Sequence, residues 1–174
     1  LADVVLHAAE LAQKDGYVLW VKDGLRPMEA QGLMGESPIA RKHPEWLVAP
    51  RLISPPGAGG HPRGMAVDVT LYDQKTNEEL DMGTPFDCFP EDKDAGIWPA
   101  HREYLDLSDA VKANRARLDD YMLRGAALCG ESLLPLPAEW WDFRFYPEET
   151  SLYAPISDAD LPPEMRVSAN NSCI

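Results

Sequence analysis

Long apolar runs, paired cysteines and an excess of positive charge are all missing from this chain of 174 residues. No stretch of about 18 consecutive apolar residues occurs, so the sequence predicts no membrane span. Lysine and arginine together number 16 against 29 aspartates and glutamates, which gives a formal net charge of −13 at pH 7. Nucleic acids and anionic membranes attract basic surfaces, and this balance therefore argues against both as partners.

Cysteine is scarce, and its pattern excludes two further classes. Cys88, Cys129 and Cys173 are widely spaced, odd in number and free of any CxxC pair, unlike a zinc finger or a disulfide framework. A reducing compartment is favoured, and we expect a cytoplasmic protein. A periplasmic location stays open, because the chain begins at Leu1 and we expect that a preceding segment was removed or left out. The motifs GxSxG, GxGxxG and the P-loop are also missing, so serine hydrolases and nucleotide-binding proteins have no support.

Apolar periodicity outlines one domain of mixed structure. It predicts helices over 3–14, 26–33 and 108–128, strands over 17–21, 65–72 and 140–146, and an extended piece over 80–89. Residues 35–63 are rich in proline and glycine and predict a long irregular loop. The strand over 65–72 alternates apolar and polar residues, which places Asp68 on its polar face.

The most informative stretch runs from Gly60 to Leu71. It places His61 in a Gly/Pro-rich loop and Asp68 seven residues later in a predicted strand. An imidazole nitrogen and a carboxylate oxygen can converge on a divalent metal ion. The alternative is a loop histidine beside a carboxylate that only hydrogen-bonds locally, and spacing alone does not decide between them.

A second cluster, Glu139-Trp140-Trp141-Asp142, offers two carboxylates three residues apart. A metallohydrolase needs a base that takes a proton from water and passes it to the leaving amine, and a glutamate beside a metal ligand suits this role. Taken alone, the cluster favours a core strand of aromatic residues with solvated acids between them.

Two further residues stand in turns with suitable chemistry. Arg26 follows the strand over 17–21 and can stabilise an oxyanion through its fork of donors. Asp87, in Gly83-Thr84-Pro85-Phe86-Asp87, can bind a substrate ammonium group. Taken alone, Arg26 is more simply interpreted as a surface arginine, and Asp87 as a turn residue.

In order and spacing, these fragments resemble the VanX-type D-alanyl-D-alanine dipeptidases of the zinc D,D-peptidase family. The matching fragments are Asp23-Gly24-Leu25-Arg26-Pro27, His61-Pro62-Arg63-Gly64-Met65-Ala66-Val67-Asp68, Met82-Gly83-Thr84-Pro85-Phe86-Asp87, Asn114-Arg115 and Glu139-Trp140-Trp141. The resemblance implies an α+β fold, with a small central antiparallel sheet flanked by helices in a single domain. It assigns residues 1–155 to a metallopeptidase-like domain that lacks the family's N-terminal segment, and leaves 156–174 as a flexible, acidic, proline-rich tail.

The resemblance also implies the roles of the site residues. His61, Asp68 and Asp142 would be the metal ligands, Glu139 the general base, Arg26 the group that stabilises the tetrahedral intermediate, and Asp87 the partner of the substrate's amino group. The expected cofactor is zinc, and the expected partner is a small dipeptide, D-Ala-D-Ala or a related one, with no oligomeric state implied.

Two positions depart from the family pattern. Asp142 stands where the family has histidine, and an oxygen ligand in place of imidazole hardens the site, so manganese or iron could compete with zinc. Gly59 replaces a serine that would contact the dipeptide. The leading hypothesis is an active metal-dependent dipeptidase; the alternative is a catalytically silent relative that binds a peptide or cell-wall fragment without cleaving it.

Overall fold

The computed structural model describes residues 1–49, 51–94 and 96–166, which fall into two compact units. Unit 1 consists of residues 1–24 and 66–146, and unit 2 consists of residues 25–65 and the chain from Pro147 onward. Each unit is described here by itself.

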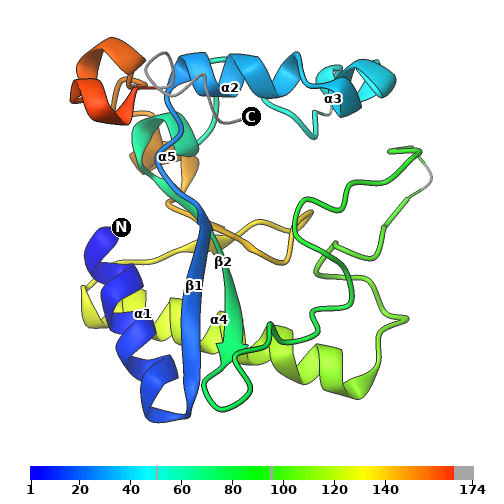
Figure 1. Cartoon of the computed structure of the whole chain (residues 1–174), viewed down its shortest axis with the longest axis vertical. Helices are drawn as coiled ribbons and strands as arrows, with labels where there is room; N and C mark the ends of the chain where they lie inside the picture. The colour runs from blue at the N-terminus through cyan, green and yellow to red at the C-terminus, as the bar shows by residue number, and fades with distance from the viewer. Residues whose placement is uncertain (50, 95, 167–174) are drawn as a thin grey trace. The chain divides into compact units, whose positions relative to one another are not determined.

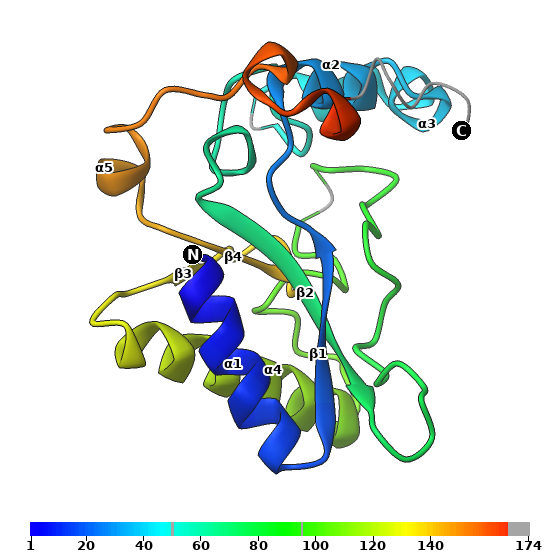
Figure 2. The same cartoon turned by 60° about the vertical axis from the view of Figure 1, so that its left-hand side comes forward.

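Unit 1 is built on a four-stranded antiparallel sheet in the order β1-β2-β4-β3. Figure 1 labels β1 and β2, and Figure 2 labels all of these strands. The strands are β1 (Tyr17–Asp23), β2 (Ala66–Asp73), β3 (Leu134–Pro135) and β4 (Asp142–Arg144). β2 lies between β1 and β4, and its residues 66–71 are buried on both faces. The predicted α+β class with a small antiparallel sheet is confirmed.

Two helices of unit 1 pack against one another beside β1, α1 (Ala2–Lys14) and α4 (Asp109–Leu128) (Figure 2). The predicted cap of α4 is present, because the Ser108 hydroxyl accepts a hydrogen bond from the Val111 amide at 3.2 Å. The helices meet at Gly125, where an added Cβ would lie 2.7 Å from the carbonyl oxygen of Val4 and 2.9 Å from the amide nitrogen of Ala8. Glycine at this position therefore permits close helix packing.

Unit 2 contains α2 (Met28–Gly35), α3 (Pro38–Lys42), α5 (Pro147–Thr150) and four 3-10 turns, η1 (Pro44–Leu47), η2 (His61–Arg63), η3 (Asp158–Asp160) and η4 (Pro163–Met165). The Gln31 side chain joins α2 to the following loop: its amide nitrogen donates to the Ala58 carbonyl at 2.9 Å, and its oxygen accepts from the Gly57 amide at 2.8 Å. The η3 turn is tied to α2 through Glu29, which accepts from Ser157 and from the Asp158 amide.

Three sequence predictions of local structure were wrong. The loop over 35–63 is not irregular throughout, because it includes α3, η1 and η2. The strand over 140–146 is reduced to Asp142–Arg144, and the extended piece over 80–89 forms only an isolated bridge between Tyr72 and Glu79 just before it. Buried aromatic residues caused the second error, since Trp140 and Trp141 mimic strand alternation while lying before the ladder.

Substitution Gly125→Ala should destabilise unit 1, because the new methyl group must push α1 away from α4. We expect the free energy of unfolding to fall by about 1–3 kcal/mol, the usual cost of overpacking a tight contact. Thermal unfolding followed by circular dichroism measures this loss. Arg124→Ala, at the neighbouring exposed position of α4, is the control, and a Gly125→Ala protein with an unchanged or higher Tm would contradict the packing argument.

Candidate metal centre and catalytic site

Three aspartates form a row across the sheet of unit 1. Asp68 on β2 is the register partner of Asp23 on β1 and of Asp142 on β4. Side chains of directly opposed residues leave the sheet on the same face. A carboxylate oxygen of Asp23 accordingly lies within 4.8 Å of one of Asp68, and Asp68 and Asp142 are only 2% and 1% exposed.

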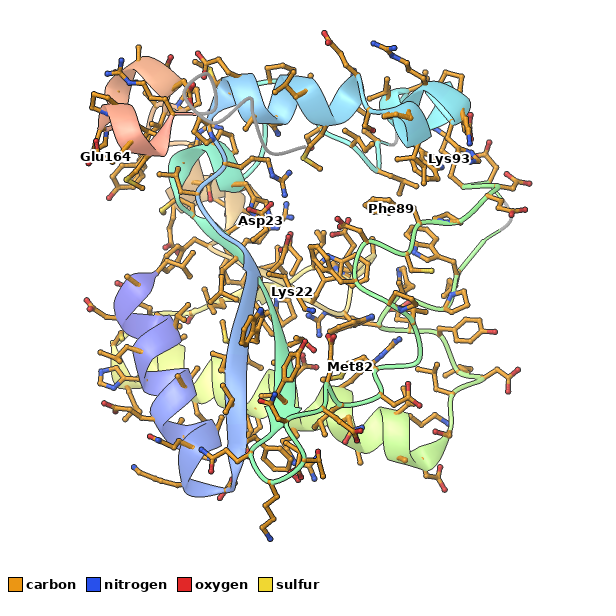
Figure 3. The ribbon with its side chains drawn as sticks, viewed as in Figure 1. Lys22, Asp23, Met82, Phe89, Lys93 and Glu164 are labelled. Carbon is orange, nitrogen blue, oxygen red and sulfur yellow. The ribbon has the colours of Figure 1, made fainter. Side chains whose placement is uncertain are left out.

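A bulge in β1 places Asp23 in this row. Val21 pairs with Val69, but Asp23 pairs with Asp68, so Lys22 is an extra residue in the ladder. Because strand side chains alternate between faces, an unbroken register would set Asp23 on the face of Val21 instead. Lys22 and Asp23 follow one another at the end of β1 (Figure 3).

Arg144 supplies positive charge at the Asp142 end of the row. Its Nε donates to Asp142 Oδ1 at 2.8 Å, and its Nη2 donates to Asp142 Oδ2, so both carboxylate oxygens are engaged. The two residues lie two positions apart on β4 and therefore share a face. Asp142, Glu139 and Asp68 together raise the pKa of Arg144 against the opposing effect of burial.

Glu139 lies in the turn before β4, where its amide donates to the Leu136 carbonyl at 3.3 Å and its carbonyl accepts from the Asp142 amide at 3.4 Å. Burial of the carboxyl group, reinforced by the negative charges of Asp142 and Asp68, raises its pKa to about 8. Arg144 opposes this shift but does not cancel it. A carboxyl group with a pKa near neutrality can both accept and return a proton.

The turn that carries Glu139 is held by Arg102. Its Nη2 donates to the carbonyl oxygens of Trp140 at 2.9 Å and Asp142 at 3.2 Å, and its Nε donates to that of Leu136 at 2.9 Å. The same guanidinium pairs with Asp119 on α4. The long helix therefore fixes the backbone on which both Glu139 and Asp142 stand.

The loop after β2 is anchored to α4 by the Asn114-Arg115 pair. Asn114 Nδ2 donates to the Asp81 carbonyl at 2.9 Å, and Arg115 Nε donates to the Met82 carbonyl at 2.8 Å. Trp140 Nε1 then donates to Thr84 Oγ1 at 2.9 Å, which links this loop to the Glu139 turn. An open hollow of unit 1 is lined by Lys22, Met82 and the rest of residues 79–86 (Figure 3).

Asp87 ends this loop with φ of 57°, a left-handed conformation that aspartate adopts more readily than most residues. It is exposed, and its charge contributes to the raised pKa of Glu139.

Unit 2 holds the other predicted site residues. His61 is 7% exposed in the η2 turn, and its carbonyl oxygen accepts from the Arg26 amide at 3.1 Å. Arg63 Nη1 donates to the carbonyl oxygens of Gly57 at 2.6 Å and Gly59 at 2.9 Å, which shapes the loop before His61. The backbone of Gly59 has a φ of 83°, which glycine adopts readily and serine rarely, so glycine suits this position.

The structure thus brings Asp68, Glu139 and Asp142 together in unit 1 and places Arg26, Gly59 and His61 along one hydrogen-bonded segment of unit 2. Sequence reasoning missed Asp23 as a member of the row and Arg144 as the partner of Asp142. Arg144 follows Asp142 at the two-residue spacing that shares a strand face, and this signal could have identified it. Asp23 enters the row only through the bulge at Lys22, which the sequence pattern did not indicate.

A general-base candidate thus lies beside a row of three aspartates, two of them buried, on the sheet of an α+β fold. The sequence profile of the D-ala-D-ala dipeptidase family, peptidase family M15, matches residues 1–158, and the chain belongs to this family.

Two curated relatives are similar over much of the chain. The D-alanyl-D-alanine dipeptidase of Escherichia coli K12 is 30% identical over 133 residues, which are 76% of this chain and 58% of that protein. The enzyme of the same name from Enterococcus faecium is 29% identical over 155 residues, 82% of this chain and 69% of that protein. The chain therefore spans less than two thirds of the Escherichia coli relative.

Among solved structures, VanYB in complex with D-Alanine-D-Alanine matches with a TM-score of 0.46 and 15% identity, over 86% of this chain and 72% of the other.

Within the described residues, no helix is long and apolar enough to cross a membrane.

The predicted ligands His61, Asp68 and Asp142 have side chains whose chemistry suits a divalent cation. Carboxylate oxygens and an imidazole nitrogen are ordinary zinc ligands, and like charges opposed across strands are unfavourable unless positive charge is supplied nearby. Arg144 already supplies one such charge at Asp142.

The raised pKa of Glu139 predicts a pH dependence of stability in protein stripped of metal by a chelator. Between about pH 4.5 and 8 the folded chain keeps a proton that the unfolded chain releases. The free energy of unfolding should therefore fall as pH rises through this window. Residue 139 cannot titrate in Glu139→Gln, so the Tm of this variant minus the Tm of the native chain should increase from pH 5 to pH 8.

Thermal unfolding at several pH values measures the effect, with Glu131→Gln as a control that removes an exposed glutamate. Parallel Tm profiles for the native chain and Glu139→Gln would show that the Glu139 carboxyl group does not hold this proton.

Proposed function

We propose that this chain is a metal-dependent dipeptidase that hydrolyses D-Ala-D-Ala or a closely related small dipeptide. The observation that carries the proposal is Glu139, whose pKa is raised to about 8 beside Asp68 and Asp142 in a chain of the D-ala-D-ala dipeptidase family. The two curated relatives bear the name of the same activity.

His61, Asp68 and Asp142 would hold the cation, with zinc as the expected ion. A bound divalent cation supplies Lewis acidity, which polarises a carbonyl group and acidifies water. The His/Asp/Asp set is richer in oxygen than the ligand set that the family resemblance implies, so its preference for zinc over harder ions should be weaker.

Glu139 would move the protons of the reaction. The positive charge of a bound cation would favour the ionised form of the Glu139 carboxyl group, and this form accepts a proton from the attacking water. It would then deliver that proton to the nitrogen of the leaving amino acid, for which a pKa near neutrality is suited. Arg102 keeps the turn of Glu139 in place through three backbone carbonyl groups.

Arg26 and Asp87 would bind the charged parts of the substrate and transition state. The Arg26 guanidinium would donate hydrogen bonds to the carbonyl oxygen as it gains negative charge. The Asp87 carboxylate would accept from the substrate's ammonium group, and its exposed position leaves it accessible to a ligand. Gly59, where the family has serine, offers no hydroxyl to the dipeptide.

Substitution Glu139→Gln should lower D-Ala-D-Ala hydrolysis by at least about 10²-fold, the lower range for loss of a general base. Release of D-alanine, measured by a coupled D-amino-acid oxidase assay, gives the rate, and elemental mass spectrometry gives the zinc content. Zinc should be retained. Full activity in Glu139→Gln would remove Glu139 from the mechanism, and Glu131→Gln controls for the loss of one carboxylate.

A silent binding protein is the second candidate function, and the Asp142–Arg144 ion pair favours it because the third ligand already has a cationic partner. In that case the native chain should show no turnover, and Asp142→His should create D-Ala-D-Ala hydrolysis where there was none. Activity in the native chain that Asp142→His leaves equal or lower would exclude this candidate.

A further inference from the structure

Asp142, at the position where the family resemblance implies histidine, is bound by an arginine. Both atoms of the Arg144 fork that face Asp142, Nε and Nη2, donate to its two carboxylate oxygens. The Asp142 side chain is 1% exposed and the Arg144 side chain 23% exposed. A bidentate pair this well buried holds both partners in a fixed geometry.

Arg144 also acts on the rest of the carboxylate cluster. The charges of Glu139 and Asp68 stabilise its guanidinium in addition to Asp142. Arg102, the other arginine near the Glu139 turn, directs its hydrogen bonds to backbone carbonyl groups and to Asp119 instead. Arg144 is thus a guanidinium of unit 1 whose hydrogen bonds reach a side chain of the row.

We propose that Arg144 is a built-in counter-cation of this site, which competes with the divalent metal for Asp142. The inference rests on the proposed metal-binding role of Asp142. A dication can use Asp142 as a ligand only beside, or after displacement of, a guanidinium of like sign, so the arginine weakens metal binding. Arg144 then stabilises the protein without metal and, through the same contact, lowers its affinity for metal.

The opposite role has a different signature. A hydrogen-bonded partner that orients a metal ligand strengthens binding, and its removal usually weakens metal affinity by about 10–100-fold. A competing cation predicts the reverse sign. The direction of the change on removing Arg144 therefore separates the two roles, whatever its size.

The test is zinc affinity of the full chain, measured by competition with a chromophoric chelator, for the native protein and Arg144→Gln. We expect Arg144→Gln to bind zinc at least about tenfold more tightly, because it removes the like charge and leaves Asp142 to the metal. Arg144→Lys keeps the charge and should stay near the native affinity. Arg124→Gln removes an exposed arginine paired with Asp120 and should leave the affinity unchanged.

Loss of one partner from a buried ion pair is costly, so a second variant separates weak metal binding from loss of the fold in Arg144→Gln. The double variant Asp142→Asn/Arg144→Gln exchanges the pair for two neutral amides of similar shape and should fold as well as the native chain. It should show no gain in zinc affinity, because the competing arginine and the ligand have both been removed. A tenfold gain in the double variant would overturn the proposal.

The remaining outcomes separate this inference from the proposed function. Weaker or unchanged zinc binding in Arg144→Gln, with zinc bound by the native chain, overturns the competition and leaves the dipeptidase proposal standing. Zinc bound by Arg144→Gln but not by the native chain supports the competition and overturns the active dipeptidase. Zinc bound by neither protein overturns the competition and zinc as the cofactor of the proposed dipeptidase.

Discussion

The need to compensate several carboxylates on one buried sheet face is the constraint on which this site depends. Asp23, Asp68 and Asp142 are opposed across three neighbouring strands, and Glu139 lies close enough for its pKa to respond to two of them. Like charges in such positions repel one another strongly in a medium that screens them poorly. Two features reduce this repulsion: Glu139 retains a proton, and the guanidinium of Arg144 pairs with Asp142. A bound cation would be a third, and it would act on the same groups.

The scaffold around the row is held largely by arginine donors on backbone oxygens. Arg102 binds the carbonyl groups of the Glu139 turn, and Arg115 binds that of Met82 in the loop that leads to Asp87. Both start on or pair with α4, so one helix sets the position of two site loops. Such bonds fix the backbone of both loops through its carbonyl oxygens.

Membership in the D-ala-D-ala dipeptidase family and the Asp142–Arg144 pair point to different consequences. The family supports the proposed hydrolysis of a small D,D-dipeptide, whereas the ion pair gives Asp142 a cationic partner. If Asp142 stands in place of the histidine that the family resemblance implies, the change adds one negative charge and Arg144 returns one positive charge. On the proposed assignment, the net charge around the metal would then be kept while the ligand chemistry changes, and zinc affinity would respond to either residue.

The sequence by itself determined the helices over 3–14 and 108–128, the strand that carries Asp68, and the pairing of Glu139 with Asp142 in one short segment, because periodicity, a serine cap and local spacing are properties of neighbouring residues. The family resemblance, carried by short motifs, extended this to the fold class. Only the tertiary structure decided that Asp23 joins the row, since a single extra residue at Lys22 reverses the face of every later side chain on β1. It alone also showed burial raising the pKa of Glu139, because this depends on how far segments distant in sequence exclude water from the same space. The two-residue spacing of Asp142 and Arg144 is visible in the sequence, but their two hydrogen bonds are seen only in the structure.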